Sequence, residues 1–171
     1  MDVSQTLEQR VAELGEQLVA QSRFVATAES CTGGLLAGAL TSVSGSSAWF
    51  DQGWVTYTNA AKTTQLGVSP EILQAFGAVS EQVAKQMAAG VLAMAPEATL
   101  SLTTTGIAGP GGATADKPVG LVWFGFAQRL DDVVVVTAEH RVFTGDREAV
   151  RMQAVRFAIE HVLQLTDSRT A

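Results

Sequence analysis

Short strand-forming segments of this chain run directly into loops that are rich in glycine and hydroxyl side chains. Residues 24–28 precede the loop ESCTGG at 29–34, and residues 99–105 precede a glycine-rich loop at 106–112. In α/β proteins, the loops that follow strands bind ligands, and glycine N–H groups at the start of a helix suit an anion such as phosphate. The pattern restricts the chain to an α/β fold and indicates an enzyme or a nucleotide-binding protein.

The rest of the sequence alternates between helical and strand-like spacing. Apolar residues three and four positions apart predict helices, and runs of β-branched or aromatic residues predict strands. Strands are predicted over 24–28, 53–57, 99–105, 118–127 and 133–143, and helices over 7–18, 33–42, 62–66, 70–76, 80–95 and 146–162. The polar turn at 128–132 predicts an antiparallel hairpin between the last two strands, so the expected sheet of five strands is mixed.

The length of 171 residues fits one domain. Hydrophobic residues make up 47% and charged residues 16%, which favours a buried sheet covered by helices over a disordered chain. The net charge of −6, without a cluster of lysine or arginine, argues against nucleic acid as a partner. No apolar run approaches the roughly 20 residues needed to span a bilayer, so no membrane partner is expected. The amino terminus lacks the pattern of a signal peptide, which predicts a cytoplasmic location.

The two histidines do not support the commonest hydrolytic sites. His140 falls in a predicted strand and His161 near the end of the last predicted helix, so neither lies in a hydroxyl-rich loop. A Ser-His-Asp triad is therefore not expected. The single cysteine and the two separated histidines give no zinc-ligand spacing, so no metal is predicted.

A serine can react without histidine if a lysine kept neutral by burial takes its proton. Lys62 is the candidate base, because it follows a predicted strand and can reach a cleft there. Ser30 and Ser47 are alternative nucleophiles, since each precedes a predicted helix start whose N–H groups can stabilise an anion. Cys31 is a weaker third candidate. A surface lysine and helix-capping serines are the plainer interpretations of the same residues.

Further candidates for substrate binding come from three places in the chain. The loop that begins at Gly106 has neither Walker A nor Rossmann spacing, but it permits close backbone approach, and the Thr105 hydroxyl precedes it. Arg147, at the start of the last predicted helix, can hold a phosphate or carboxylate. Tyr57, the only tyrosine, can donate a hydrogen bond or stack on a flat ring.

Several ordered motifs together resemble one known family, the carboxyl-terminal domain of the competence/damage-inducible protein CinA. The motifs are AESCTGG at 28–34, GSS at 45–47, VTYTN at 55–59, Lys62, GAVS at 77–80, TGIAGP at 105–110 and KPVG at 117–120. The resemblance covers a core of about residues 7–163 and leaves 166–171 as a polar tail. It implies a three-layer α/β/α sandwich without a cofactor.

The same resemblance implies an activity and a set of site residues. Stand-alone domains of this family convert nicotinamide mononucleotide and water into nicotinic acid mononucleotide and ammonia, which returns the pyridine ring to NAD synthesis. The chemistry is attributed to a serine with a lysine base, and Lys62 with either Ser47 or Ser30 matches it. Ser47 is the favoured nucleophile, with Tyr57 assisting. The residues that would bind the substrate or shape the oxyanion site are Ser30, Thr32, Gly33, Gly34, Thr105, Gly106 and Arg147.

A binding protein without catalytic activity is the alternative hypothesis. Loops that hold a phosphate look alike in enzymes and in nucleotide- or protein-binding modules, so the sequence leaves both open. Release of ammonia from nicotinamide mononucleotide would separate them. A homo-oligomer is also expected, because exposed apolar helix faces would allow self-association.

Overall fold

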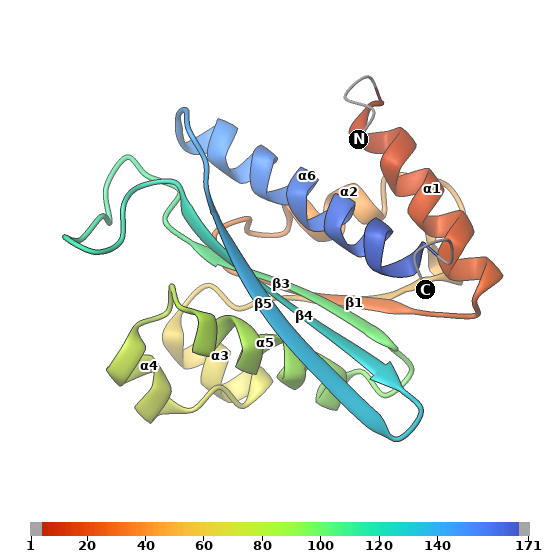
Figure 1. Cartoon of the computed structure of the whole chain (residues 1–171), viewed down its shortest axis with the longest axis horizontal. Helices are drawn as coiled ribbons and strands as arrows, with labels where there is room; N and C mark the ends of the chain where they lie inside the picture. The colour runs from red at the N-terminus through yellow and green to blue at the C-terminus, as the bar shows by residue number, and fades with distance from the viewer. Residues whose placement is uncertain (1–4, 168–171) are drawn as a thin grey trace.

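The computed structural model describes residues 5–167, which form a five-stranded sheet with helices on both faces (Figure 1). The strand order is β2-β1-β3-β4-β5. The strands are β1 (Val25–Glu29), β2 (Phe50–Val55), β3 (Leu100–Gly106), β4 (Leu121–Leu130) and β5 (Val133–Val142). β1 pairs in parallel with β2 and β3, whereas β4 is antiparallel to both β3 and β5. The predicted mixed sheet and its terminal hairpin are confirmed.

Two groups of helices cover the sheet, one on each face, as Figure 1 shows. One group contains α1 (Leu7–Ala20), α2 (Leu35–Leu40) and α6 (Arg147–Thr166), and the other α3 (Asn59–Leu66), α4 (Pro70–Phe76) and α5 (Glu81–Met94). The three-layer α/β/α sandwich is confirmed. None of the helices within residues 5–167 is long and apolar enough to cross a membrane.

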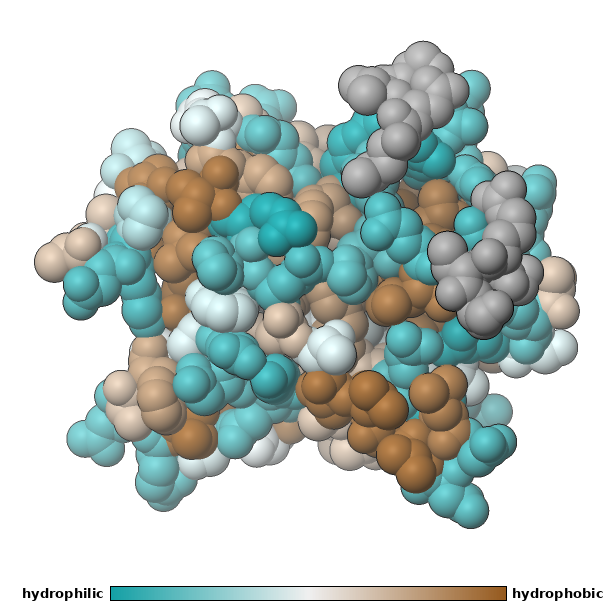
Figure 2. Space-filling view, in the orientation of Figure 1, coloured by the Kyte–Doolittle hydropathy of each residue, from teal (hydrophilic) through white to brown (hydrophobic). Residues whose placement is uncertain are grey.

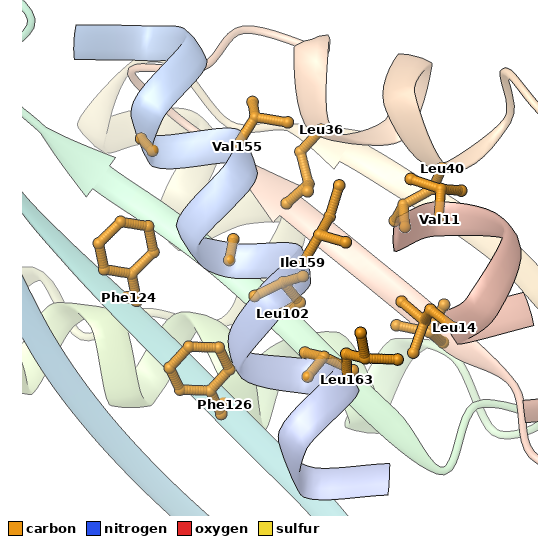
Figure 3. Packing of buried hydrophobic residues seen from close by; sticks show 14 of the residues in the cluster. Val11, Leu14, Leu36, Leu40, Leu102, Phe124, Phe126, Val155, Ile159 and Leu163 are labelled. Carbon is orange, nitrogen blue, oxygen red and sulfur yellow. The ribbon is translucent and has the colours of Figure 1, made fainter. Parts of the chain in front are cut away.

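Each face of the sheet has its own apolar core. Under α1, α2 and α6, aliphatic side chains such as Leu36 and Ile159 belong to one buried cluster with Phe124 of β4 (Figure 3). Under α3 and α5, a smaller core contains Val68, Met87, Val91 and Leu92. The sheet is therefore buried on both faces over most of its width, which explains the near-continuous apolar run of β4.

Helix α3 is placed by a cap and by one close contact. The Thr58 hydroxyl accepts a hydrogen bond from Ala61 N, so Thr58 is the N-cap. On the other side, α5 presents Gly90 to the last turn of α3. A Cβ at Gly90 would lie 2.1 Å from the carbonyl oxygen of Leu66. Only glycine permits this approach, and the two helices pack accordingly.

Some boundaries differ from those predicted. The strand expected over 53–57 lies at Phe50–Val55, which leaves Tyr57 in the following loop. Helix α6 continues to Thr166, whose hydroxyl is buried and bonded to Gln17 Oε1, so the expected tail begins later. Of that tail, 168–171 lie outside the described residues.

Strand β5 is an edge strand with exposed apolar side chains. Val133 is 61% exposed, and Leu130, Val134, Val135 and Val142 are also exposed; we call these five residues the β5 edge patch. Figure 2 shows hydrophobic surface where the β4–β5 hairpin turns at the lower right of Figure 1. An unprotected apolar edge strand is an unusual surface for an isolated protein.

Candidate active site

A buried lysine and a serine meet where β1 ends. Ser30 directly follows β1, and Lys62 lies on α3, which follows β2. The Lys62 Nζ donates hydrogen bonds to Ser30 Oγ at 3.0 Å, to the carbonyl oxygen of Thr56 at 2.8 Å and to that of Tyr57 at 3.4 Å. Lys62 is 1% exposed. Its side chain therefore points inward from the helix, which excludes the plainer interpretation of a surface lysine.

Burial makes Lys62 a much weaker base than a lysine in water. The loss of hydration disfavours the ammonium form and lowers the pKa of Lys62 from 10.5 to about 8. About a tenth of the protein then carries a neutral amine at pH 7. The two carbonyl groups can keep the two hydrogens of that amine, which directs its lone pair at the Ser30 hydroxyl.

Six of the residues predicted from the sequence line one pocket with a volume of about 230 Å³. They are Ser30, Tyr57, Lys62, Thr105, Gly106 and Arg147. They come from the carboxyl ends of β1 and β3, from the segment between β2 and α3, from α3 itself and from the first residue of α6. Parallel pairing of β1 with its two neighbours brings these ends to one edge of the sheet, where ligands bind in open α/β folds.

Arg147 joins two loops across this pocket. Its Nη1 donates to the carbonyl oxygen of Gly109 at 2.8 Å, and its Nη2 donates to the Tyr57 hydroxyl at 3.0 Å. Thr105 contributes differently, since its hydroxyl donates to the carbonyl oxygen of Ala78 at 2.8 Å. Arg147 therefore offers a cation at the rim, and Thr105 fixes the pocket wall.

Ser47 lies away from this pocket. It is an exposed residue of the short 3-10 helix η1 (Ser46–Ala48), just before β2. The first residue of β2 pairs with Val25 at the beginning of β1, whereas Ser30 follows the end of β1. Five residues of strand separate these two ends by about 16 Å. The structure does not bring Ser47 to Lys62, which corrects the favoured pairing and leaves Ser30 as its partner.

Thr32, Gly33 and Gly34 also do not line the pocket. The N–H groups at this helix start, which were expected to suit a phosphate, already bind a side chain of the protein. The carboxylate of Glu29, itself 1% exposed, accepts hydrogen bonds from the N–H groups at the beginning of α2. This role of Glu29 was not predicted from the sequence. A carboxyl group directly between a strand and a glycine turn was the available signal.

Cys31 lines the pocket beside Ser30 but is not activated. Burial raises the pKa of the Cys31 thiol from 9.0 to about 11. A helix start usually lowers the pKa of a thiol, and here the loss of hydration outweighs that effect. The ranking of Cys31 below the serines agrees with this environment.

The histidines lie outside the pocket. The Nδ1 of His161 is 2.5 Å from Glu139 Oε1, and the ring of His140 packs against Trp123 at 4.6 Å between centroids. Within residues 5–167, no group of three or more histidine, cysteine, aspartate or glutamate side chains is arranged to hold a metal ion.

Comparison with known proteins gives one consistent family. The family model described as the CinA C-terminal domain matches residues 7–166. A protein of Enterobacter agglomerans named nicotinamide-nucleotide amidohydrolase PncC is 53% identical over 92% of this chain and 94% of its own length. The protein of the same name from Escherichia coli K12 is 45% identical over 92% and 93%.

Solved structures show the same fold. The competence/damage-inducible protein CihA from Agrobacterium tumefaciens is 43% identical, with a TM-score of 0.86 over 98% of this chain and 100% of that one. The competence damage-inducible protein A from Klebsiella pneumoniae is 35% identical, with a TM-score of 0.89 over 96% of this chain and 99% of that one. A longer CinA-like protein of Chlorobaculum tepidum is 49% identical, but the match covers 37% of its length.

Proposed function

Because the chain belongs to the CinA C-terminal domain family, we propose that it hydrolyses the carboxamide of nicotinamide mononucleotide, with Ser30 as nucleophile and Lys62 as base. Relatives that are 45–53% identical over most of their length are named nicotinamide-nucleotide amidohydrolases, which supports the substrate. The observation that carries the mechanism is the 3.0 Å contact between buried Lys62 Nζ and Ser30 Oγ. A role in NAD recycling and a cytoplasmic location belong to the same proposal.

The first half of the reaction forms an acyl-enzyme. Neutral Lys62 takes the proton of Ser30, and the oxygen of Ser30 attacks the carboxamide carbon of the substrate. Backbone N–H groups at the pocket rim hold the oxyanion of the tetrahedral intermediate. The protonated Lys62 then gives its proton to the leaving nitrogen, and ammonia departs as the carbon–nitrogen bond breaks.

The second half releases the acid. Water attacks the ester carbon, and Lys62 accepts a proton from that water, so an oxygen replaces the nitrogen lost as ammonia. The bond to Ser30 breaks, the Ser30 oxygen takes the proton back, and nicotinic acid mononucleotide leaves. The same lysine thus serves both half-reactions and ends in its starting state.

Arg147 and Tyr57 are proposed to orient the substrate. Arg147 places a fork of N–H donors at the rim of the pocket, which suits the phosphate of the nucleotide. Tyr57 is 57% exposed, and its ring can cover the flat pyridine ring while its hydroxyl stays bonded to Arg147. Ser30 and Lys62 then meet the carboxamide at the inner end of the pocket.

Two matched serine variants test the assignment. Ser30→Ala is expected to lower kcat for ammonia release by about a thousandfold or more with little change in substrate affinity, because the nucleophile is lost. Ser47→Ala is expected to retain kcat within about twofold, since Ser47 lies at the other end of β1. Mass spectrometry of acid-quenched enzyme should find the acyl group on the peptide containing Ser30.

The opposite pattern, with Ser47→Ala inactive and Ser30→Ala active, would reject the assignment of the nucleophile. A wild-type protein that releases no ammonia from nicotinamide mononucleotide at high enzyme concentration would instead favour the alternative of a non-catalytic binding module.

A further inference from the structure

Glu29 is a buried carboxylate that the proposed reaction does not use. It accepts four hydrogen bonds: from the Thr32 hydroxyl at 2.6 Å, and from the N–H groups of Gly34 at 3.0 Å, Leu36 at 2.9 Å and Ala37 at 2.8 Å. Three of these donors are backbone groups around the beginning of α2. The carboxylate therefore occupies the position in which such N–H groups would otherwise bind an anion.

These bonds close the turn that carries Ser30. Glu29 lies on one side of Ser30 and reaches over the turn 30–34 to the first residues of α2. The backbone of Glu29 is held as well, since its carbonyl oxygen accepts from Thr56 N at 2.8 Å. A rigid strand end and a side-chain bond across the turn leave Ser30 little freedom to move from Lys62.

The outer side of the turn is held by another element. Arg151 of α6 donates through Nε to the carbonyl oxygen of Cys31 and through Nη2 to that of Thr32, both at 3.1 Å. The Thr32 hydroxyl also lies 2.7 Å from the hydroxyl of Thr104 on β3. Glu29 is thus the inner member of a set of bonds that fixes the backbone on which Ser30 is presented.

Glu29 does not contact the base directly. The Lys62 ammonium donates to Ser30, Thr56 and Tyr57, whereas the carboxylate oxygens of Glu29 face Thr32 and the start of α2. We therefore expect Glu29 to act on the reaction through the backbone of the turn.

We propose that Glu29 is a positioning residue, an internal anion that fills the amino end of α2 and holds Ser30 Oγ beside Lys62 Nζ. The proposal rests on the proposed function for its effect on the reaction. It also has a consequence for binding, because the phosphate of the substrate is excluded from the N–H groups of α2 and must bind elsewhere in the pocket.

The variant Glu29→Gln tests the positioning role, because glutamine keeps the size of the side chain and loses its charge. We expect kcat to fall about 30- to 300-fold while KM changes less than about threefold, and the pH at which activity rises to stay the same. Thr6→Ala is the matched control, since it removes the side-chain cap of α1, whose hydroxyl accepts from Gln9 N, far from the pocket. It should lower Tm with kcat within twofold. A Glu29→Gln variant with the same small effect on kcat would overturn the proposal.

An added anion provides a second test. In Glu29→Ala, the α2 N–H groups lose their carboxylate, and formate is small enough to replace it. We expect formate to raise both Tm and kcat of this variant in a saturable manner, with at least a tenfold recovery of kcat, and to leave wild-type protein and Thr6→Ala unchanged. A folded Glu29→Ala variant whose Tm and kcat do not respond to formate would contradict an anion requirement at this position.

Hydrogen exchange separates this inference from the proposed function. The amide hydrogens of Gly34, Leu36 and Ala37 should exchange slowly in wild-type protein and at least tenfold faster in Glu29→Gln, whatever substrate the enzyme uses. Unchanged exchange at these amides would reject the positioning role. If exchange increases but wild-type protein releases no ammonia, the structural role of Glu29 stands and the proposed function fails.

Discussion

The reactivity of the site depends on the surroundings of one side chain, Lys62. Its ammonium form is disfavoured because α3 and the pocket wall exclude water from it, and the pKa of Lys62 falls to about 8 as a result. No neighbouring cation is needed for this shift. In the proposed mechanism, the depth at which α3 holds Lys62 therefore sets the pH range in which Ser30 can be activated.

Activity should rise with pH through the pKa of Lys62. Because the neutral amine is the reactive form, kcat/KM is expected to increase about tenfold per pH unit below pH 7 and to level off above about pH 8. Lys62→Arg should lower kcat/KM by about a thousandfold or more, since arginine does not lose its proton. Lys85→Arg, on the exposed Lys85–Glu81 pair of α5, should keep the wild-type profile. A Lys62→Arg variant with the wild-type pH profile would exclude Lys62 as the base.

The stability of the protein should respond to the same titration. Between pH 8 and 10.5 the unfolded chain keeps a proton on Lys62 that the folded protein has lost, so the free energy of unfolding rises with pH. The free energy of unfolding of wild-type protein, minus that of Lys62→Met, should increase by up to about 3 kcal/mol across this window. Below pH 8 this difference should not change with pH. Urea unfolding of both proteins at several pH values measures this. If this difference decreases with pH instead, the pKa of Lys62 is not lowered in the folded protein.

The sequence predicts the types of reactive residues but only part of their arrangement. Lys62, Tyr57, Thr105 and Arg147 follow or precede predicted elements at recognisable points, and the structure brings them into one pocket. The choice between Ser30 and Ser47 depends on which end of β1 each residue occupies, and this is set by strand pairing rather than by local pattern. The anion site expected at the beginning of α2 was wrongly predicted, because the sequence indicates N–H donors there but not that the Glu29 carboxylate binds them.

At the scale of elements, the distance between α3 and α5 controls the position of Lys62. The close approach of Gly90 to Leu66 lets α3 lie against α5, and Lys62 is four residues from Leu66 on the same helix. Two residues four apart in a helix lie on the same face. A side chain at position 90 would therefore push on the part of α3 that points Lys62 into the pocket.

Gly90→Ala should damage both stability and activity. The added methyl group would lie 2.1 Å from Leu66 O, so α3 must move, and overpacking of this kind costs about 1–3 kcal/mol. We expect a lower free energy of unfolding and at least a tenfold loss of kcat as Lys62 is displaced. In Gly38→Ala, by contrast, the new methyl group meets nothing within 4 Å, and the helix should be stabilised by about 0.4–1 kcal/mol with kcat unchanged. Equal behaviour of the two variants would contradict this role of Gly90.

Local patterns predict the elements better than their ends. The predicted strands and helices all have counterparts in the structure, because their apolar spacing matches the faces that they bury. The predicted range of β2 begins three residues too late. Exposed and half-buried residues alternate in this strand, and its polar residues Asp51 and Gln52 do not resemble the apolar run by which a strand is predicted. The placement of Tyr57 in a loop follows from this shift.

At the scale of the whole molecule, the parallel half of the sheet makes the site and the antiparallel half makes an edge. Strands β1, β2 and β3 deliver their carboxyl ends to the pocket, whereas β5 ends the sheet with the β5 edge patch exposed. The homo-oligomer expected from the sequence stays a prediction. Antiparallel pairing is self-complementary, so the β5 strands of two copies can meet about a twofold axis.

The β5 edge patch gives the oligomer a specific test. Wild-type protein is expected to sediment as a dimer or larger assembly, and Val135→Lys should shift it toward the monomer by placing a charge among the exposed valines of β5. Met152→Lys, an equally exposed apolar position on α6, is the control and should leave the assembly intact. A wild-type protein that is monomeric at all concentrations would refute the prediction.

The environments of Cys31 and Lys62 reverse the order in which a thiol and an ammonium usually lose their protons. In water a cysteine ionises near pH 9.0 and a lysine near pH 10.5. In this pocket, Lys62 has a pKa of about 8 and Cys31 a pKa of about 11. The sulfur beside Ser30, the proposed nucleophile, thus stays protonated throughout the pH range in which Lys62 titrates. Peroxide and alkylating agents attack thiolates. At concentrations that inactivate enzymes with an ionised cysteine, they should therefore leave this protein active.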